Sequence, residues 1–278
     1  MKCFDVVNTV LQATYDEISD KKPGRDARIA EALDVTSAQY ANKLMKEGGP
    51  DFSDPATRFG YVFRYVPAHA HWIYELISES KAARAVFEEG KARVTCLGGG
   101  PGSDVVGMLK YLDENDISCK LFVELIDGCE AWKATWSDLA YQIEWDDGLH
   151  TDYVIHDVGD HESWESPSKI EKADLITVSF FASEVFHLDT AKDYLATMLG
   201  RAKSGALVLV IDNRTSEVYR MMDSIASDAG YETLLADEGT AKIYDSGERL
   251  DIVKDFADKF GKKSRLTGNV FRRVYRKK

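Results

Sequence analysis

Four glycines stand together in the stretch RVTCLGGGPGSD, residues 93–104: Gly98, Gly99, Gly100 and Gly102. Ordering glycine is costly in conformational entropy, so a cluster this dense needs a local reason. A glycine turn between a strand and a helix lets the backbone approach a nucleotide-like ligand without an intervening side chain. The pattern therefore predicts a ligand-binding loop, with a plain tight turn as the alternative.

The spacing of these glycines narrows the choice of ligand. Gly98, Gly100 and Gly102 give GxGxG, whereas a pyrophosphate-binding loop usually carries GxGxxG. No GK[ST] follows, which excludes a Walker-type phosphate loop. The loop thus favours a nucleoside over a dinucleotide, and Ser103 or Asp104 is expected to cap the helix that follows.

Acidic residues follow the next two apolar runs. LFVELI leads into Asp127 and Gly128, and a carboxylate at the end of a second strand accepts hydrogen bonds from both ribose hydroxyls of a nucleoside. Glu124, within the run, is the fallback, and capping of the next helix is the alternative role of Asp127. In DYVIHDVGD, Asp157 suits an adenine amino group and Val158 suits an adenine face.

Groups for proton transfer are expected beyond the fourth strand and in the N-terminal part. In SFFASE, residues 179–184, two phenylalanines offer apolar walls, and Glu184 either orients or deprotonates an acceptor or simply begins a helix. No [DN]PP[YF] motif is present. Tyr65 and His69 lie one helical turn apart, and histidine is the natural proton acceptor near neutral pH. Packing of these aromatic residues in the core is the alternative.

Two further groups of residues, a cluster of possible metal ligands and a pair of tryptophans, are not expected to do chemistry. The residues of HDVGDH, 156–161, include nitrogen and oxygen donors, but Asp157 already has a nucleoside role, so no metal is predicted. Trp132 and Trp136 are one turn apart and are expected to pack between helices, although Trp132 is also placed to flank a ribose.

The secondary structure expected to position these residues changes near residue 91, from helices alone to alternating strands and helices. The N-terminal part has helical spacing, with the last of its helices broken near Pro67. Expected helices there are 6–18, 24–33, 36–46 and 56–87. From residue 91, strands alternate with helices, which predicts a mostly parallel sheet covered on both faces. Expected strands are 93–97, 120–126, 152–156, 174–179, 206–212, 241–245 and 269–275, and expected helices are 103–115, 128–141, 189–202 and 216–229. Ligands of such sheets bind at the carboxyl ends of the strands.

This change divides the chain into two predicted units. Residues 1–90 form a helical cap that serves as a substrate lid, and residues 91–278 form a Rossmann-like domain. The fold class is therefore α/β, a doubly wound, mostly parallel seven-stranded sheet whose last strand is antiparallel, with an N-terminal helical extension.

Composition limits the function classes. The 278 residues carry a formal net charge of -12, which disfavours a broad nucleic-acid-binding face, although the last eight residues, FRRVYRKK, are locally basic. Four cysteines without a CxxC pair indicate reduced thiols. No signal peptide and no membrane span are expected. A cytoplasmic protein is predicted, with a nuclear location left open, and the oligomeric state is not predicted.

From residue 91 onward, the chain resembles the class I S-adenosylmethionine-dependent methyltransferases. The resemblance rests on the order and spacing of CLGGGPGSD, ELID, HDVGD, DLITVSFF, KSGALVLVID and the final VFRRVY, which suits an antiparallel seventh strand. It implies S-adenosylmethionine as cofactor and methyl transfer to a small-molecule or protein acceptor. It also adds Gly128 and Ser179 to the cofactor-binding set.

Two features depart from the family pattern. Cys96 stands where the family commonly carries an acid, so backbone carbonyls near Gly98 are the alternative partners of the methionine ammonium. The separation between Gly102 and Asp127 is also longer than usual.

Three other functions stay open at this point. An RNA-base (ribosomal RNA) methyltransferase is disfavoured by the net charge. A non-catalytic methyltransferase-like binding subunit is disfavoured by the intact glycine loop with Asp127 and Asp157. An NAD-dependent oxidoreductase is disfavoured by the missing GxGxxG spacing.

Overall fold

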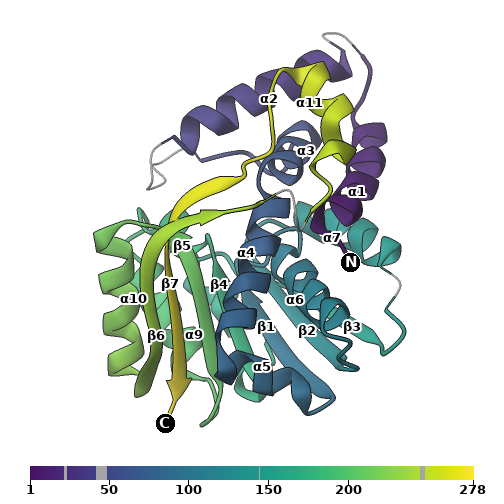
Figure 1. Cartoon of the computed structure of the whole chain (residues 1–278). Coiled ribbons are helices and arrows are strands. Elements are labelled where there is room, and N and C mark those ends of the chain that lie inside the picture. Colours follow the sequence, from purple (N-terminus) through teal and green to yellow (C-terminus); the bar gives the residue numbers. More distant parts are fainter. Residues whose placement is uncertain (22–23, 42–48, 144, 245–247) are drawn as a thin grey trace.

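Seven strands form one mixed sheet, in the order β3-β2-β1-β4-β5-β7-β6 (Figure 1). The computed structural model describes residues 1–21, 24–41, 49–143, 145–244 and 248–278. The first five strands pair in parallel, and β7 runs antiparallel to both β5 and β6. The predicted α/β class and the antiparallel last strand are confirmed. The strands are β1 (Lys91–Leu97), β2 (Lys120–Asp127), β3 (Leu149–Ile155), β4 (Leu175–Ser179), β5 (Leu207–Asn213), β6 (Tyr231–Lys242) and β7 (Thr267–Lys277).

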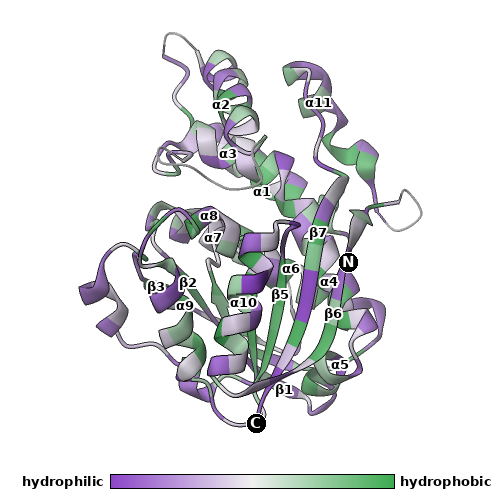
Figure 2. Cartoon of the chain, turned by 90° about the vertical axis from the view of Figure 1, so that its left-hand side faces the viewer, coloured by the Kyte–Doolittle hydropathy of each residue, from purple (hydrophilic) through white to green (hydrophobic). Residues whose placement is uncertain are grey.

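The predicted position of the sixth strand was wrong. β6 ends at Lys242, whereas the strand was expected at 241–245, of which residue 245 lies outside the described residues. β6 is an edge strand whose side chains are mostly exposed or half-buried, so it lacks the continuous apolar run that marks β4 and β5. In Figure 2, β5 is mainly hydrophobic, whereas β7, the strand between β5 and β6, carries hydrophilic segments.

Helices cover both faces of the sheet. Helices α4 and α6 pack on one face, and α9 and α10 pack on the other. The helices are α1 (Cys3–Glu17), α2 (Arg25–Gln39), α3 (Pro55–Arg64), α4 (Val66–Glu79), α5 (Lys81–Glu88), α6 (Ser103–Glu114), α7 (Ala131–Gln142), α8 (Ala182–Val185), α9 (Ala191–Gly200), α10 (Ser216–Asp228) and α11 (Lys254–Phe260).

Most predicted helices are present, but two predictions were wrong about where one helix ends and the next begins. The expected helices 24–33 and 36–46 form the single helix α2, which ends at Gln39; residues 42–46 lie outside the described residues. The expected helix 56–87 breaks twice. The first break is near Pro67, as predicted, and the second is at Ser80, whose hydroxyl accepts a hydrogen bond from the Ala83 N–H (3.2 Å) and so caps α5.

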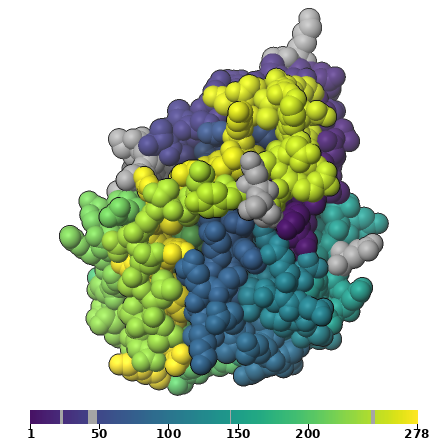
Figure 3. Space-filling model, in the orientation of Figure 1, coloured from purple at the N-terminus to yellow at the C-terminus, as the bar shows by residue number. Residues whose placement is uncertain are grey.

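A layer of helices lies over the carboxyl ends of the parallel strands (Figure 1). It contains α1, α2 and α3 together with α11, which belongs to an insertion between β6 and β7 that the sequence analysis did not predict. The Phe256 ring of α11 packs against Tyr15 and Phe59, with centroids 5.9 and 5.2 Å apart. Figure 3 shows this insertion lying against the N-terminal helices.

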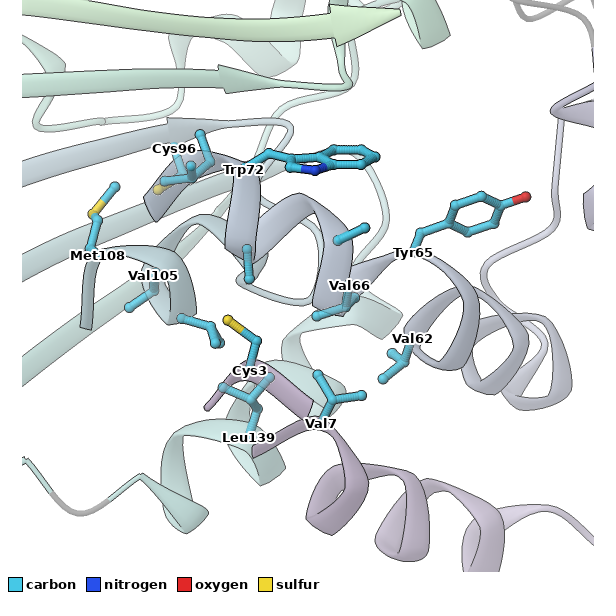
Figure 4. Packing of buried hydrophobic residues seen from close by; sticks show 14 of the residues in the cluster. Cys3, Val7, Val62, Tyr65, Val66, Trp72, Cys96, Val105, Met108 and Leu139 are labelled. Carbon is cyan, nitrogen blue, oxygen red and sulfur yellow. The ribbon is translucent and has the colours of Figure 1, made fainter. Parts of the chain in front are cut away.

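The helical layer shares a hydrophobic cluster with the face of the sheet that α4 and α6 cover. In Figure 4, side chains from five helices meet: Cys3, Val7, Val62, Val66, Val105, Met108 and Leu139. All seven are buried. The Tyr65 ring, which is also buried, points away from these seven side chains in Figure 4.

A buried ion cluster also joins the insertion to the rest of the molecule. Glu248 accepts hydrogen bonds from the Lys110 ammonium and from the Phe4 N–H (3.3 Å), and Lys110 Nζ lies 3.0 Å from His71 Nδ1. Burial alone would raise the pKa of Glu248, but hydrogen bonds from His71 and Lys110 outweigh it and hold this pKa at about 2. The cluster thus places a carboxylate of the insertion against α1, α4 and α6.

Candidate active site

The glycine loop follows β1 directly and takes a backbone that other residues rarely adopt. Gly98 and Gly102 have φ of +66° and +85°. A Cβ on Gly98 would lie 2.2 Å from the Phe181 ring, and one on Gly102 would lie 2.1 Å from the Trp136 ring. Both positions therefore exclude a side chain, for reasons of conformation and of space.

Asp127 connects the end of β2 to this loop. Its Oδ2 accepts a hydrogen bond from the Gly100 N–H and its Oδ1 accepts one from the Cys129 N–H, both at 2.9 Å. Burial raises the pKa of Asp127 to about 6, although these N–H groups partly oppose the shift. A carboxylate accepts about four hydrogen bonds, so Asp127 keeps acceptor capacity for a ligand hydroxyl.

The fallback residue Glu124 has a different position. Both of its carboxylate oxygens accept from the Lys169 N–H, at 2.9 and 2.8 Å, and the side chain is buried within the sheet. Its role in the structure is to hold the segment that leads into β4.

The loop after β3 brings Asp157 and Val158 next to the end of β2. The His156 N–H donates to the Asp127 carbonyl (3.1 Å), and a Cβ on Gly128 would lie 3.4 Å from the His156 carbonyl oxygen. Asp157 Oδ1 accepts from the Gly159 N–H (2.8 Å). Val158 is buried. The strand ends thus bring together the acid and the apolar residue that the sequence predicted for an adenine.

Asp104 makes a buried contact that its expected role as a helix cap did not predict. Neither Ser103 nor Asp104 caps α6, because Gly102 is the capping residue and no side chain bonds there. Instead, the buried Asp104 carboxylate accepts a hydrogen bond from the Thr177 hydroxyl of β4. Burial raises its pKa to about 6, and the hydroxyls of Thr177 and Ser179 oppose the shift.

This carboxylate lies close to Cys96. Thr177 is the register partner of Cys96 across β1 and β4. Burial, followed by the Asp104 charge, raises the pKa of the Cys96 thiol well above its ordinary value. An acid is therefore present beside the position where the resemblance expected one, but it comes from α6. The sequence feature that could have indicated this acid is the position of Asp104, two residues after Gly102, the last glycine of the loop.

The chain turns sharply after Ser179. Phe180 has φ of +52°, a conformation that costs about 1–3 kcal/mol for a bulky residue and concentrates at functional sites. Its N–H donates to the Ile211 carbonyl (2.8 Å), which fixes the turn. The short helix α8 follows, and Asp212 of β5 holds its start by accepting from the Ser183 N–H (2.9 Å).

Glu184 of α8 points toward the helical layer. Its carboxyl group accepts a hydrogen bond from the Tyr40 hydroxyl. Burial raises the pKa of Glu184 to about 8, and the charges of Asp127 and Asp212 act in the same direction. A carboxyl group with this pKa exchanges a proton readily near neutral pH.

His69 and Tyr65 also face this turn. Their rings lie 5.9 Å apart, and the His69 ring stacks on Phe180. Burial, together with the charge of Arg265, lowers the pKa of His69 well below its ordinary value. His69 is therefore neutral at pH 7. Tyr65 contacts Tyr40, the partner of Glu184, with ring centroids 5.1 Å apart.

The described residues show neither a metal-binding cluster nor a membrane-spanning helix. No group of three or more histidine, cysteine, aspartate or glutamate side chains is arranged to hold a metal ion within the described ranges. None of the helices that the structure describes is both long enough and apolar enough to cross a membrane.

Comparison with known proteins adds the following findings. No family model and no curated protein matches the chain. Solved structures do. A proposed RNA methyltransferase from Pyrococcus horikoshii is 14% identical, with 89% of this chain and 97% of that chain covered and a TM-score of 0.48. A SAM-dependent methyltransferase from Methanosarcina mazei is 10% identical, with 71% and 97% covered and a TM-score of 0.48. A TehB-like SAM-dependent methyltransferase from Corynebacterium glutamicum is 14% identical, with 81% and 100% covered and a TM-score of 0.47.

The topology itself fits the class I fold. The seven-stranded, mostly parallel sheet with its antiparallel β7 is the Rossmann-like arrangement that the resemblance implies. The candidate residues gather at the carboxyl ends of β1 to β4, where such sheets bind their ligands.

Proposed function

We propose that this protein is an S-adenosylmethionine-dependent methyltransferase that acts on a small-molecule or protein acceptor. The observation that carries the proposal is the position of Asp127. Its carboxylate joins the end of β2 to the Gly100 N–H of the glycine loop. Asp157 and Val158 follow at the next strand end, so the acceptors and the apolar surface suited to a nucleoside lie together.

The residues present fit this cofactor. Gly98 and Gly102 keep side chains out of the loop, and Asp127 keeps acceptor capacity for ribose hydroxyls. The Asp104 carboxylate, beside Cys96, supplies a negative charge for the methionine ammonium. The proposed cofactor-binding set also keeps Gly99, Gly128 and Ser179.

When bound, S-adenosylmethionine supplies an electrophilic methyl group on its sulfonium. The chain's own residues then position the acceptor and take its proton where one is released. We assign the proton to Glu184, whose carboxyl group follows β4 and already accepts a hydrogen bond from Tyr40. His69 acts as a positioning residue through Phe180, and Tyr65 forms a wall of the acceptor site.

The helical cap of residues 1–90 is proposed to cover the acceptor. Tyr40 and Tyr65 belong to this part of the chain, and the Tyr40 hydroxyl reaches Glu184 beyond β4. A cytoplasmic location stays part of the proposal and is supported by four cysteines in the free thiol state.

The basic C-terminal stretch gives no support to an RNA acceptor. It forms β7, where Arg272 pairs with Asp237 and Glu79, and Arg273 pairs with Asp223 and Glu238. Arg276 lies 3.6 Å from Glu232. Charges neutralised in this way contribute little to phosphate binding.

Calorimetry with S-adenosylmethionine and with NAD tests the proposal. We expect S-adenosylmethionine to bind and NAD not to bind; the reverse result would overturn the proposed function. Transfer of a labelled methyl group to cell extract, fractionated into RNA, protein and metabolites, then tests the acceptor class. Label in the metabolite or protein fraction supports the proposal, and label in RNA alone contradicts it.

A further inference from the structure

Two arginines meet at the edge of the acceptor site. Arg64 ends α3, and Arg265 precedes β7 in the insertion. The Arg265 backbone N–H donates to the Arg64 carbonyl at 2.7 Å, which fixes the two residues side by side. Each guanidinium donates to a backbone carbonyl, Arg64 to Lys263 and Arg265 to Thr267.

In the part of the chain that the structure describes, no carboxylate lies within ion-pair distance of the Arg64 or Arg265 guanidinium. Arg272 and Arg273 show the opposite pattern, since each forms ion pairs with acids. In a chain with a net charge of -12, two adjacent half-buried cations with no counter-ion among the described residues are unexpected.

Buried nitrogen atoms without a hydrogen-bond partner among the described residues lie in this arginine pair and beside it. Arg64 Nε, Trp72 Nε1 and His69 Nε2 are buried and make no hydrogen bond within the described residues. Trp72 is 0% exposed and His69 is 4% exposed. The Arg265 guanidinium lies 6.0 Å from the Trp72 ring, and the rings of Trp72 and His69 lie 6.1 Å apart. Leaving a buried donor unpaired is unfavourable, because the group has lost its hydrogen bonds to water, so such a group normally has a partner.

Ring contacts connect the arginine pair to the proposed methyl-acceptor site near Glu184. His69 stacks on Phe180, and Tyr65, which directly follows Arg64, contacts Tyr40. Tyr40 in turn donates to Glu184. The cationic pair and the proposed proton acceptor therefore lie at opposite ends of one continuous row of aromatic side chains.

We propose that Arg64 and Arg265 bind an oxyanion, a carboxylate or a phosphate group, carried by the methyl acceptor. Planar guanidinium groups pair with such anions in a bidentate manner, and the unpaired indole N–H of Trp72 adds a neutral donor. This inference rests on the proposed function, because it treats the row from Arg265 to Glu184 as the acceptor site.

The test measures anion binding by calorimetry on protein saturated with S-adenosylhomocysteine. The probes are phenylacetate and phenyl phosphate, with 2-phenylethanol as the neutral control. We expect at least one anionic probe to bind and the alcohol not to bind, and the stronger probe distinguishes a carboxylate from a phosphate. Arg265→Gln and Arg64→Gln are each expected to weaken binding about tenfold or more, the loss of one charge-assisted contact.

Matched variants separate a specific site from net charge. Arg249→Gln removes one positive charge from an exposed arginine that lies 3.5 Å from Asp5, and it should leave anion binding unchanged. Arg265→Lys keeps the charge but loses bidentate geometry, so it should bind more weakly than the native protein and more tightly than Arg265→Gln. A melting curve for each variant shows that it is folded before its affinity is compared.

Three outcomes would overturn the inference. They are no binding by either anion, an equal loss in Arg249→Gln, or a loss of S-adenosylhomocysteine binding in Arg265→Gln with unchanged binding of 5′-methylthioadenosine. The last result would assign the arginines to the cofactor's own carboxylate. Failure of S-adenosylhomocysteine to bind the native protein would instead count against the proposed function, and the anion titration would then be run on the protein alone.

Discussion

The imidazole ring of His69 lies flat against the phenyl ring of Phe180, with centroids 3.8 Å apart and planes 7° from parallel. This stack holds a residue of positive φ at the end of β4 against helix α4. The histidine contributes a surface here, because burial keeps it neutral.

The first prediction separates His69 from Glu184. His69→Phe keeps the stacked ring and removes both nitrogens, so methyl transfer should fall less than about tenfold, whereas Glu184→Gln removes the proton acceptor and should slow transfer by about 100-fold or more. Initial rates at saturating cofactor measure both effects. A larger loss in His69→Phe than in Glu184→Gln would reverse the two roles.

The second prediction concerns the pH dependence of stability. The pKa of Glu184 is raised to about 8, and those of Asp104, Asp127 and Asp212 are raised to about 6, all first by burial. The folded protein therefore holds protons that the unfolded chain releases, so the free energy of unfolding should fall as the pH rises from about 4 to 8. Urea unfolding at several pH values should show a flatter decline between pH 6 and 8 for Glu184→Gln. An unchanged slope would contradict burial of this carboxyl group.

The third prediction distinguishes Asp127 from Glu124. Asp127→Asn should weaken S-adenosylmethionine binding about 10- to 100-fold, because hydrogen bonds to a charged group contribute about 1.5–3 kcal/mol. Glu124→Gln should leave cofactor affinity unchanged, since both Glu124 oxygens accept from Lys169. Calorimetry on folded variants measures both affinities, and a larger effect at Glu124 would move the ribose contact into the middle of β2.

The fourth prediction concerns the glycine loop. Gly102→Ala should lower the free energy of unfolding by about 1–3 kcal/mol, since its Cβ meets the Trp136 ring and its φ is +85°. Gly205→Ala is the matched control, because Gly205 has a similar φ of +83° and a Cβ there meets no atom within 4 Å. Chemical denaturation should show a smaller loss in the control. Equal losses in the two variants would mean that the contact with Trp136 is unimportant.

The fifth prediction concerns the buried cluster around Glu248. Glu248→Gln should destabilise the protein by about 3–5 kcal/mol, because the buried Lys110 loses its close anion and keeps the more distant Glu114 carboxylate, 3.9 Å away. The depressed pKa of Glu248 means that its contribution is present above about pH 4.5 and is lost as the pH falls through about 2. His71 has a raised pKa, so its contribution is present below about pH 6.5 and declines at higher pH. The free energy of unfolding, measured between pH 2 and 8, should include this added stability between about pH 4.5 and 6.5 in the native protein. The same measurement on Glu248→Gln should lack it.

The sequence allowed the central sheet to be predicted because its strands carry strong local patterns. LITVS and LVLVI are continuous apolar runs, as expected for strands covered on both faces. β6 could not be placed in this way, since its polar edge pattern resembles that of a loop.

Site residues, too, could be predicted only where a local sequence pattern fixes their position. Strand-end residues such as Asp127 could be predicted because position along a parallel strand fixes position in space. Asp104 and Tyr40 could not, since their partners, Thr177 and Glu184, are 73 and 144 residues away and only tertiary packing brings them together. The roles of Arg64 and Arg265 likewise depend on an insertion that has no local signature.

The contacts between α11 and the N-terminal helices set an order of assembly during synthesis. Phe256 packs against Tyr15, Phe59 and Phe63, and Lys259 pairs with Asp26. Helices α1 to α3 emerge from the ribosome long before these partners, and loop closure over such separations is slow. The first helices to be made are thus among the last to be completed, and nascent chains that stop before residue 254 expose the apolar surface that α11 covers.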